Sequence, residues 1–296
     1  MGQEMHLKGM EKVREKLPGY SGKRLALLPL LALGTALLTL AFLISLDILP
    51  RLLVQLPFLA LLEPLLPICG MTLCLAIALR LIWGVWWKRS ELKAEFGELA
   101  YQRIIPRGIS GIGMVFGSVF HAFMSVRSLP LGPPMNEITV LFSQSLLHLV
   151  GIPVEIDIPL RVILAGFFLL LALMTVQRAF LTFGVDYMIV IYLYFPDESE
   201  IQKREIYSIL RHPTYFAGVL LGIAAMFFRM SIYSIIFFVL IYLTFRAQIS
   251  VEEKELVERF GDGYSEYMKK VPGLRVRPRD FAAYARFLLG RSGDRE

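Results

Sequence analysis

The feature that most constrains this chain is a series of long segments almost free of ionisable side chains. A helix needs about 20 apolar residues to cross the hydrocarbon core of a bilayer. Lipid offers no partners for backbone N–H and C=O groups, so such segments must be helical. The candidate spans are residues 25–46, 65–87, 109–126, 160–183, 215–228 and 232–245. The sequence therefore predicts an all-α, polytopic transmembrane bundle of about six spans.

Charged residues are scarce and unevenly placed. They make up 19% of the 296 residues, against about a quarter in an average soluble domain. Lysine and arginine gather in three places: six in residues 1–24, five in residues 88–107 and ten in residues 250–296. Cytoplasmic loops of membrane proteins collect these residues, so we expect both termini on the cytoplasmic side. The net charge of +6 then reflects orientation in the bilayer, and no nucleic-acid partner is predicted.

The chain divides into three regions. Residues 1–24 form a basic, amphipathic arm, which we expect to be a surface helix at the cytoplasmic face. Residues 25–157 form an N-terminal transmembrane region of unassigned role. Within it, residues 138–150 are too short to span and are expected to form an interfacial or re-entrant helix. Residues 158–296 hold the remaining spans and a charged cytoplasmic tail.

Most polar residues inside the apolar segments have structural explanations. The two cysteines lie in one apolar run, and His121 and His148 have no neighbour at metal-ligand spacing. No metal site is predicted, and each histidine is expected to be a packing or interface residue. Gly113 and Gly117 form a G-x-x-x-G pair, which predicts close packing against a neighbouring helix.

The pentapeptide Arg211-His212-Pro213-Thr214-Tyr215 begins the fifth apolar segment. Proline is favoured in the first helical turn, so Arg211 and His212 are expected just outside the helix. The unpaired N–H groups and the positive end of the helix dipole lie beside them. This arrangement predicts a corner that attracts anions. Taken alone, the pentapeptide is equally consistent with a basic membrane flank followed by a helix start.

Arg246, Ser250 and Glu253 lie on one helical face where the last span leaves the membrane, and Glu252 lies about 100° away. Charged residues at this depth are costly unless they are paired or functional. Taken alone, the segment is better explained as a solvated amphipathic helix with Arg–Glu pairs.

The two motifs together favour a binding site. A turn at residues 229–231 joins their helices, so the hairpin must bring the basic corner beside the two carboxylates. This polarity suits a zwitterionic amino acid that carries a ribose: its carboxylate would contact Arg211 and His212, and its ammonium and hydroxyls the glutamates. Tyr264 and Tyr267, in the tail, are placed to contact an adenine.

The ordered pattern of these pieces resembles the isoprenylcysteine carboxyl methyltransferase family and its phospholipid methyltransferase relatives. The pieces are R-H-P-x-Y, an arginine after the helical hairpin, E-E, F-G-x-x-Y-x-x-Y and V-P. The resemblance covers about 90 residues, from near 183 to 273, and Phe183-Gly184 resembles an upstream L-G element. One departure is Glu205-Ile206-Tyr207, where the family has G-x-Y before R-H-P.

The resemblance implies an integral membrane enzyme that uses S-adenosylmethionine. The cofactor would lie in a cytoplasmic pocket closed by the helical tail, and a lipophilic acceptor, isoprenylcysteine-like or phospholipid-like, would enter from the bilayer. His212, Tyr215, Glu252 and Glu253 carry over as cofactor contacts, and Arg246 would face the reacting groups. An amine acceptor must lose a proton before it attacks, and Glu252 is a candidate base.

Two other functions fit parts of the sequence. Integral membrane reductases of the sterol-reductase type share an R-H-P-x-Y-like element but use NADPH. The E-E and F-G-x-x-Y pieces favour methyl transfer over reduction. A non-enzymatic scaffold or a transporter is the third possibility, although transporters usually carry charged or broken helices near the midplane.

Overall fold

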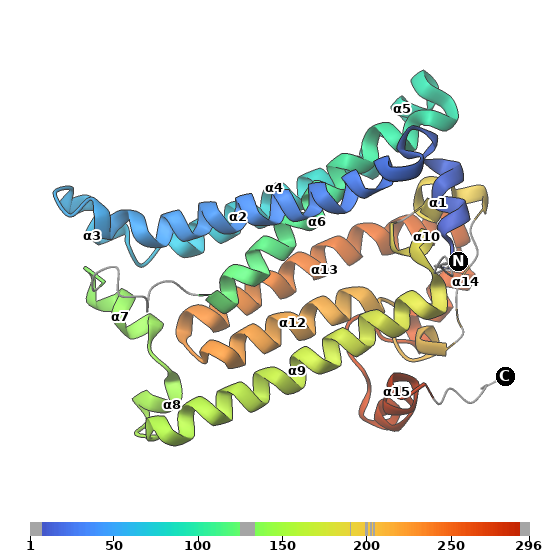
Figure 1. Ribbon diagram of the computed structural model, residues 1–296. Helices are drawn as coiled ribbons and strands as arrows, with labels where there is room; N and C mark the ends of the chain where they lie inside the picture. The colour runs from blue at the N-terminus through green and yellow to red at the C-terminus, as the bar shows by residue number, and fades with distance from the viewer. Residues whose placement is uncertain are drawn as a thin grey trace, which may run out of the picture.

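The structure is a computed structural model that describes residues 8–124, 134–189, 191–198, 201, 203 and 205–290 (Figure 1). All regular secondary structure within these residues is helical. Long helices run between two ends of the molecule, and short helices gather at those ends (Figure 1). The predicted all-α architecture is therefore confirmed.

Three helices form an N-terminal layer: α2 (Leu27–Leu52), α4 (Leu66–Trp87) and α6 (Ala100–Met124). α6 packs against both of the others, and two of its glycines allow the approach to α2. A Cβ atom at Gly113 would lie 2.4 Å from the carbonyl oxygen of Ala32, and one at Gly117 would lie 2.4 Å from that of Ala36. The close packing predicted for the G-x-x-x-G pair is confirmed, and its partner is α2.

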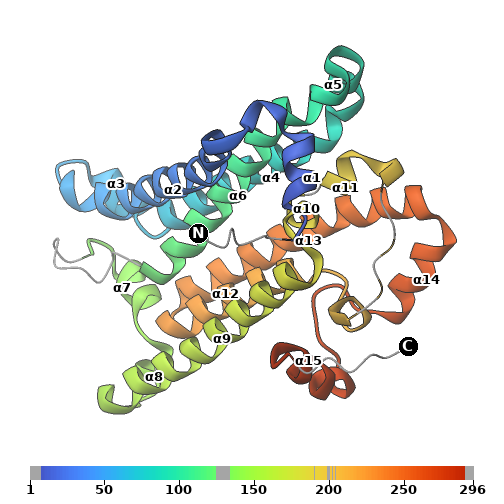
Figure 2. The ribbon, with the colours of Figure 1, turned by 45° about the vertical axis from the view of Figure 1, so that its right-hand side comes forward.

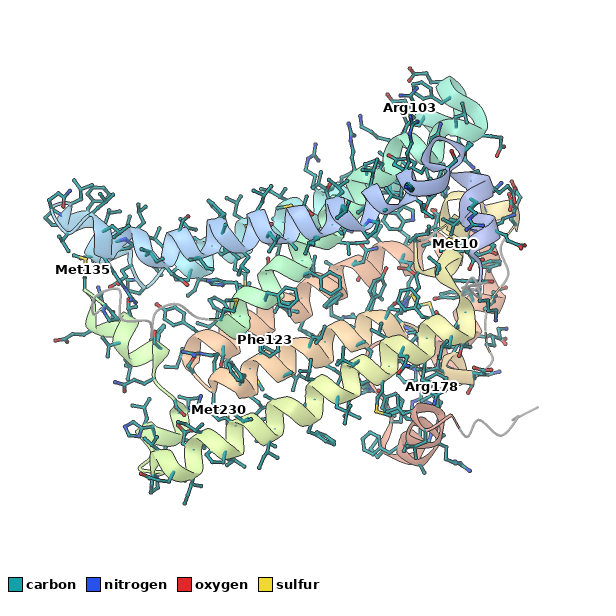
Figure 3. The ribbon with its side chains drawn as sticks, in the orientation of Figure 1. Met10, Arg103, Phe123, Met135, Arg178 and Met230 are labelled. Carbon is teal, nitrogen blue, oxygen red and sulfur yellow. The ribbon has the colours of Figure 1, made fainter. Side chains whose placement is uncertain are left out.

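Three further helices form a C-terminal layer: α9 (Val154–Phe183), α12 (Pro213–Arg229) and α13 (Ile232–Phe260). α12 packs against α9 and α13, and α13 also contacts α4 and α6, which joins the two layers. Met230, in the turn between α12 and α13, has a left-handed backbone, and Ser231 caps α13 with a capping box. Met10 and Met230 lie toward opposite ends of the molecule, so the open ends of this hairpin face the N-terminal arm (Figure 3).

Short helices mark the two ends. At one end lie α1 (Met10–Lys16), α5 (Arg89–Phe96), α10 (Val185–Met188), α11 (Ile191–Tyr194), α14 (Asp262–Lys270) and α15 (Phe281–Leu288) (Figures 1 and 2). At the other end lie α3 (Pro57–Leu62), α7 (Glu137–Ser143) and α8 (Leu146–Leu149). The interfacial segment predicted at residues 138–150 thus forms two short helices. We call the end that carries α1 and α14 the basic end, because the Lys/Arg-rich segments gather there.

Four helices in the described residues are long and apolar enough to cross a membrane: Gly22–Leu52, Leu66–Trp87, Val154–Phe183 and Ile232–Phe260. They include four of the six predicted spans. α12 has only 17 residues, and α6 is not among the four candidates. Only 17% of the apolar window of α9 is buried within the protein, which leaves most of its apolar surface available for contact with lipid. The chain is an integral membrane protein with four such candidate spans.

The N-terminal arm contains a short amphipathic helix, α1, whose Glu11, Arg14 and Glu15 are exposed. Val13 and Leu17 are almost fully buried and pack in a core with Tyr101 and Tyr194. The apolar face of the amphipathic arm therefore packs on protein. Its position is fixed further by Lys16, whose Nζ lies 2.6 Å from Oε1 of Glu198.

A buried histidine–carboxylate contact joins α2 to α6. Nε2 of His121 lies 2.8 Å from Oδ2 of Asp47, and both side chains are fully buried. Close by along the chain, Nε of Arg51 lies 3.6 Å from Oε1 of Glu63. His121 is thus a buried packing residue, as predicted, but it is not isolated, because it has a partner 74 residues away in the sequence.

Candidate functional site

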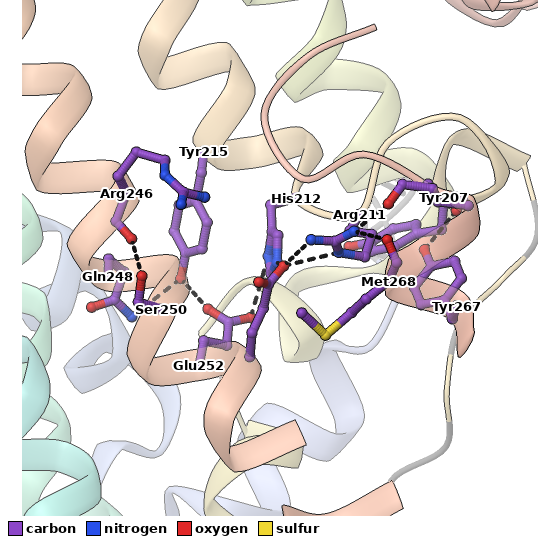
Figure 4. A network of polar contacts seen from close by, with 12 residues as sticks. Tyr207, Arg211, His212, Tyr215, Arg246, Gln248, Ser250, Glu252, Tyr267 and Met268 are labelled. Carbon is purple, nitrogen blue, oxygen red and sulfur yellow. Dashed lines mark hydrogen bonds and ion pairs between the residues drawn. The ribbon is translucent and has the colours of Figure 1, made fainter. Parts of the chain in front are cut away.

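The α12–α13 hairpin brings the two sequence motifs together at the basic end. α12 begins at Pro213, as predicted, with His212 at the N-cap position. α13 has 29 residues against the 17 of α12, so it runs past the start of its partner. Gln248 then lies beside Tyr215, and the two glutamates lie one turn further on, beside Arg211 and His212 (Figure 4).

Glu253 is the centre of the polar network. Its Oε1 accepts hydrogen bonds from Nε of Arg211 at 2.9 Å and Nη2 of Arg211 at 2.5 Å. The same oxygen lies 3.0 Å from Nε2 of His212. The Glu253 side chain is only 11% exposed, so this carboxylate depends on its two partners to offset the cost of burying its charge.

Arg211 also fixes the tail that follows α14. Its Nη1 donates to the carbonyl oxygens of Met268 and Val271, and its backbone N–H donates to the carbonyl oxygen of Pro272. The backbone N–H of His212 donates to the carbonyl of Gly273. The R-H-P element therefore holds the tail against the polar network.

Glu252 joins the network from the other side of α13. Its Oε2 accepts a hydrogen bond of 2.6 Å from the Tyr215 hydroxyl. The His212 ring stacks on the Tyr215 ring, with 5.6 Å between centroids and 25° between planes. Oε1 of Glu252 lies 3.7 Å from Nδ1 of His212, which is too long for a strong hydrogen bond. Glu252 therefore keeps capacity to accept a bond from a ligand.

Tyr264 and Tyr267 lie on α14 and are buried, 4% and 6% exposed. Their rings meet edge to face at 5.7 Å, and the Tyr267 hydroxyl donates to the Tyr207 carbonyl at 2.6 Å. Burial raises the pKa of both phenols, and the nearby Glu252 and Glu253 carboxylates raise that of Tyr264 further. Both phenol groups are therefore neutral, and they lie on α14 beside the two carboxylates.

Arg246 stands apart from this cluster. It lies seven residues before Glu253 on α13, about 10 Å along the helix axis. Its side chain is exposed, and its carbonyl oxygen accepts a hydrogen bond from the Ser250 hydroxyl (Figure 4). The structure thus brings Arg211, His212, Tyr215 and the two glutamates into direct contact, and leaves Arg246 outside this cluster.

The sequence did not identify Gln248 or Trp83 as members of the network. Nε2 of Gln248 lies 3.5 Å from the Tyr215 hydroxyl, and Oε1 of Gln248 accepts a 3.0 Å bond from Trp83 Nε1 on α4. The position of Gln248, one helical turn before Glu252, was a usable signal. No comparable signal pointed to Trp83, because only the packing of α4 against α13 brings its side chain to Gln248.

Residues 161–258 match the model of the isoprenylcysteine carboxyl methyltransferase (ICMT) family. The matched segment starts within α9 and ends near the end of α13. It includes Arg211, His212, Tyr215, both glutamates, Gln248 and Arg246, whereas Trp83, Tyr264 and Tyr267 lie outside it. No curated protein and no solved structure shows a significant match to the chain. The resemblance inferred from the motifs is confirmed, and the match supports a membrane methyltransferase that acts on a lipid-type substrate.

Proposed function

Because residues 161–258 match the ICMT family model, we propose that this protein is an S-adenosylmethionine-dependent methyltransferase. Its acceptor is a lipid or a lipid-anchored group, either isoprenylcysteine-like or phospholipid-like, and methyl transfer takes place at the cytoplasmic face of the membrane. The observation that carries the proposal is the continuous network from Arg211 through Glu253, His212 and Glu252 to Tyr215.

The residues of the network fit the cofactor. Glu252, with unused acceptor capacity at Oε1, suits an ammonium group or ribose hydroxyls. Arg211 and His212 lie at the start of α12, where cationic side chains and a helix N-terminus favour a carboxylate. Tyr264 and Tyr267 offer an aromatic wall for an adenine. When bound, the cofactor supplies a methyl group that its sulfonium already activates.

The chain itself must orient the acceptor, exclude water and manage protons. Arg211 excludes water by tying the tail carbonyls of Met268 and Val271 over the site. Glu252 is placed to take the proton of an amine acceptor, whereas a carboxylate acceptor needs no base. Arg246, whose side chain is exposed, is placed to hold the polar group of an acceptor that arrives from the lipid.

The basic end is proposed to face the cytoplasm, with both termini on that side. The Lys/Arg-rich segments identified in the sequence gather at this end with the motif network (Figure 1), and cytoplasmic loops are enriched in these residues. In this orientation the cofactor reaches the site from the cytoplasm and the acceptor from the bilayer.

Binding calorimetry on the full chain in a maltoside detergent tests the proposal. We expect S-adenosylhomocysteine to bind and to raise the melting temperature, and NADPH to do neither. Binding of NADPH alone would favour the reductase class, and binding of neither compound would favour a non-enzymatic scaffold. Either result would overturn the proposal.

A further inference from the structure

The last helix of the described chain, α15, lies outside the two layers of long helices, beside the end of α9 (Figures 1 and 2). It lies beyond the family match, which stops at residue 258, and it is not part of the polar network around Glu253. The methyltransferase motifs therefore do not account for this helix.

One face of α15 packs on protein. Tyr284, Phe287 and Leu288 are buried in a hydrophobic cluster that includes Phe183 at the end of α9. The Tyr284 hydroxyl also shares a hydrogen bond with the hydroxyl of Thr175, one of the buried residues of α9. Helical spacing of three and four residues places the buried side chains on one side of α15. This side therefore holds the helix against α9.

The opposite face of α15 is also apolar, but the described residues do not cover it. Phe281 and Leu289 are 57% and 61% exposed, and Ala282 and Ala285 on the same side are exposed as well. Arg286 is the one charged residue of this helix. The outer face of a helix on a water-exposed surface is normally polar. The composition of α15 suits a helix that lies in the interface of a membrane.

The position of α15 along α9 agrees with an interfacial location. Nε of Arg178 on α9 donates to the carbonyl oxygen of Leu288 at 3.0 Å. Thr175 and Arg178 lie 8 and 5 residues before Phe183, where α9 ends, so α15 contacts this helix about 8–12 Å from its end. Only 17% of the apolar window of α9 is buried. The outer face of α15 therefore continues the surface that α9 offers to lipid.

The segment that enters α15 is basic. Residues 274–286 contain four arginines against one acidic residue: Arg275, Arg277, Arg279, Arg286 and Asp280. Arg279 lies 3.8 Å from Asp280, whereas Arg275 and Arg286 are exposed and form no salt bridge with another described residue. Clusters of arginine beside a membrane are attracted to anionic lipid head groups. The apolar face and the arginines therefore favour the same partner.

We propose that α15 and the arginines at its entrance bind the anionic phospholipid head groups of the bilayer that holds the chain, with Phe281 and Leu289 among the acyl chains at the interface. The partner is the surrounding lipid and not a methyl acceptor, so the inference goes beyond methyl transfer and does not depend on it.

The test uses the full chain with Phe281→Trp in nanodiscs of phosphatidylglycerol and phosphatidylcholine. Bromine on the acyl chains quenches tryptophan emission. One preparation carries it on phosphatidylglycerol, and the other carries it on the same number of phosphatidylcholine molecules, so the two differ only in which lipid quenches. The emission of the wild-type chain, which has three tryptophans on α4, is subtracted.

We expect both lipids to quench the introduced tryptophan, and the anionic lipid to quench it at least about two-fold more strongly. Equal quenching would show an interfacial helix without charge recognition. Quenching by neither lipid would show that protein, such as a second copy of this chain, covers α15. Either result would overturn the proposal.

Matched variants locate the charge that recognises the lipid. In the Phe281→Trp background, one variant removes three exposed arginines: Arg275→Gln, Arg279→Gln and Arg286→Gln. It should lose the preference for phosphatidylglycerol and keep the quenching by phosphatidylcholine. The control removes three exposed cations beside α2 and α4 at the same end of the molecule: Lys23→Gln, Arg24→Gln and Lys88→Gln. It should keep the preference. A preference that survives the arginine changes, or that the control loses equally, would refute the assignment.

Salt provides a test that needs no second variant, in case the arginine variant does not fold. High ionic strength screens exposed charges and leaves the burial of apolar side chains in place. The excess quenching by phosphatidylglycerol should therefore disappear in 1 M salt, about the concentration at which the screening length falls to 3 Å, while quenching by phosphatidylcholine remains. Excess quenching that persists in this salt would overturn the role of the arginines.

Discussion

Two histidine–carboxylate pairs with similar geometry lie at different places in this molecule. His212 and Glu253 approach to 3.0 Å at the basic end, and His121 and Asp47 approach to 2.8 Å between α2 and α6. The first pair shares its carboxylate with Arg211 and contacts the chain tail, whereas the second is fully buried, with the His121 ring beside Phe237. The same bond can therefore belong to the proposed binding site in one place and to a helix clamp in the other. The two pairs differ in exposure: the Glu253 side chain is 11% exposed, whereas those of His121 and Asp47 are fully buried.

The largest expected effect is on the buried clamp. His121→Leu leaves the Asp47 carboxylate without the imidazole, and breaking a buried pair of this kind costs about 3 kcal/mol. We expect the free energy of unfolding in mixed detergent micelles to fall by about that amount, with no change in S-adenosylhomocysteine affinity. His148→Leu, at an exposed position on α8, is the matched control and should change neither quantity.

Loss of cofactor affinity with unchanged stability in His121→Leu would contradict this distinction. It would place the α2–α6 pair in the functional machinery, and the two histidine–carboxylate pairs would then share one role.

The second largest expected effect is a loss of cofactor affinity after a change at Glu253, the centre of the motif network. Glu253→Gln keeps the shape of the side chain but removes the charge that Arg211 and His212 contact through one oxygen. A hydrogen bond to a charged group contributes roughly 1.5–3 kcal/mol, so S-adenosylhomocysteine should bind at least about ten-fold more weakly. Binding calorimetry measures this change in affinity. Glu258→Gln, an exposed glutamate on the same helix, should bind like the wild type.

A folded Glu253→Gln variant with wild-type affinity would show that this carboxylate only holds Arg211 and the tail. The network would then resemble the buried clamp more than a binding site.

His212→Lys distinguishes a site residue from a basic membrane flank. Lysine keeps a cation at the interface but lacks the rigid ring that lies between Glu252 and Glu253 and stacks on Tyr215. Pro213 fixes the backbone immediately after it. We expect normal insertion and a loss of roughly ten-fold in S-adenosylhomocysteine affinity, about 1.4 kcal/mol. Wild-type affinity would reduce the R-H-P element to a flank.

The sequence predicted the motif network better than the rest of the molecule, for a physical reason. Its residues lie within two short segments joined by one hairpin, so helical geometry alone brings them together. Asp47 and His121 are 74 residues apart, and only the packing of α2 on α6 pairs them. The docking of the N-terminal arm was missed for the same reason, since its apolar face fits lipid or protein equally well. The span count rested on length and composition, and α12, with 17 residues, lies below the usual length.

The smallest expected effect concerns Glu205, which replaces the glycine of the family pattern. Its φ of +50° lies in the left-handed region that favours glycine, at a cost of about 1 kcal/mol for another residue. Glu205→Gly should therefore raise the free energy of unfolding slightly, by about 0.5 kcal/mol once the added freedom of the unfolded chain is subtracted. Glu205→Asp is the matched variant, since aspartate tolerates the left-handed region and keeps the charge; its stability should change less than that of the glycine variant. Chemical unfolding in mixed detergent micelles measures both changes. A glycine variant that is less stable than the wild type would show that contacts of the Glu205 side chain outweigh the backbone strain.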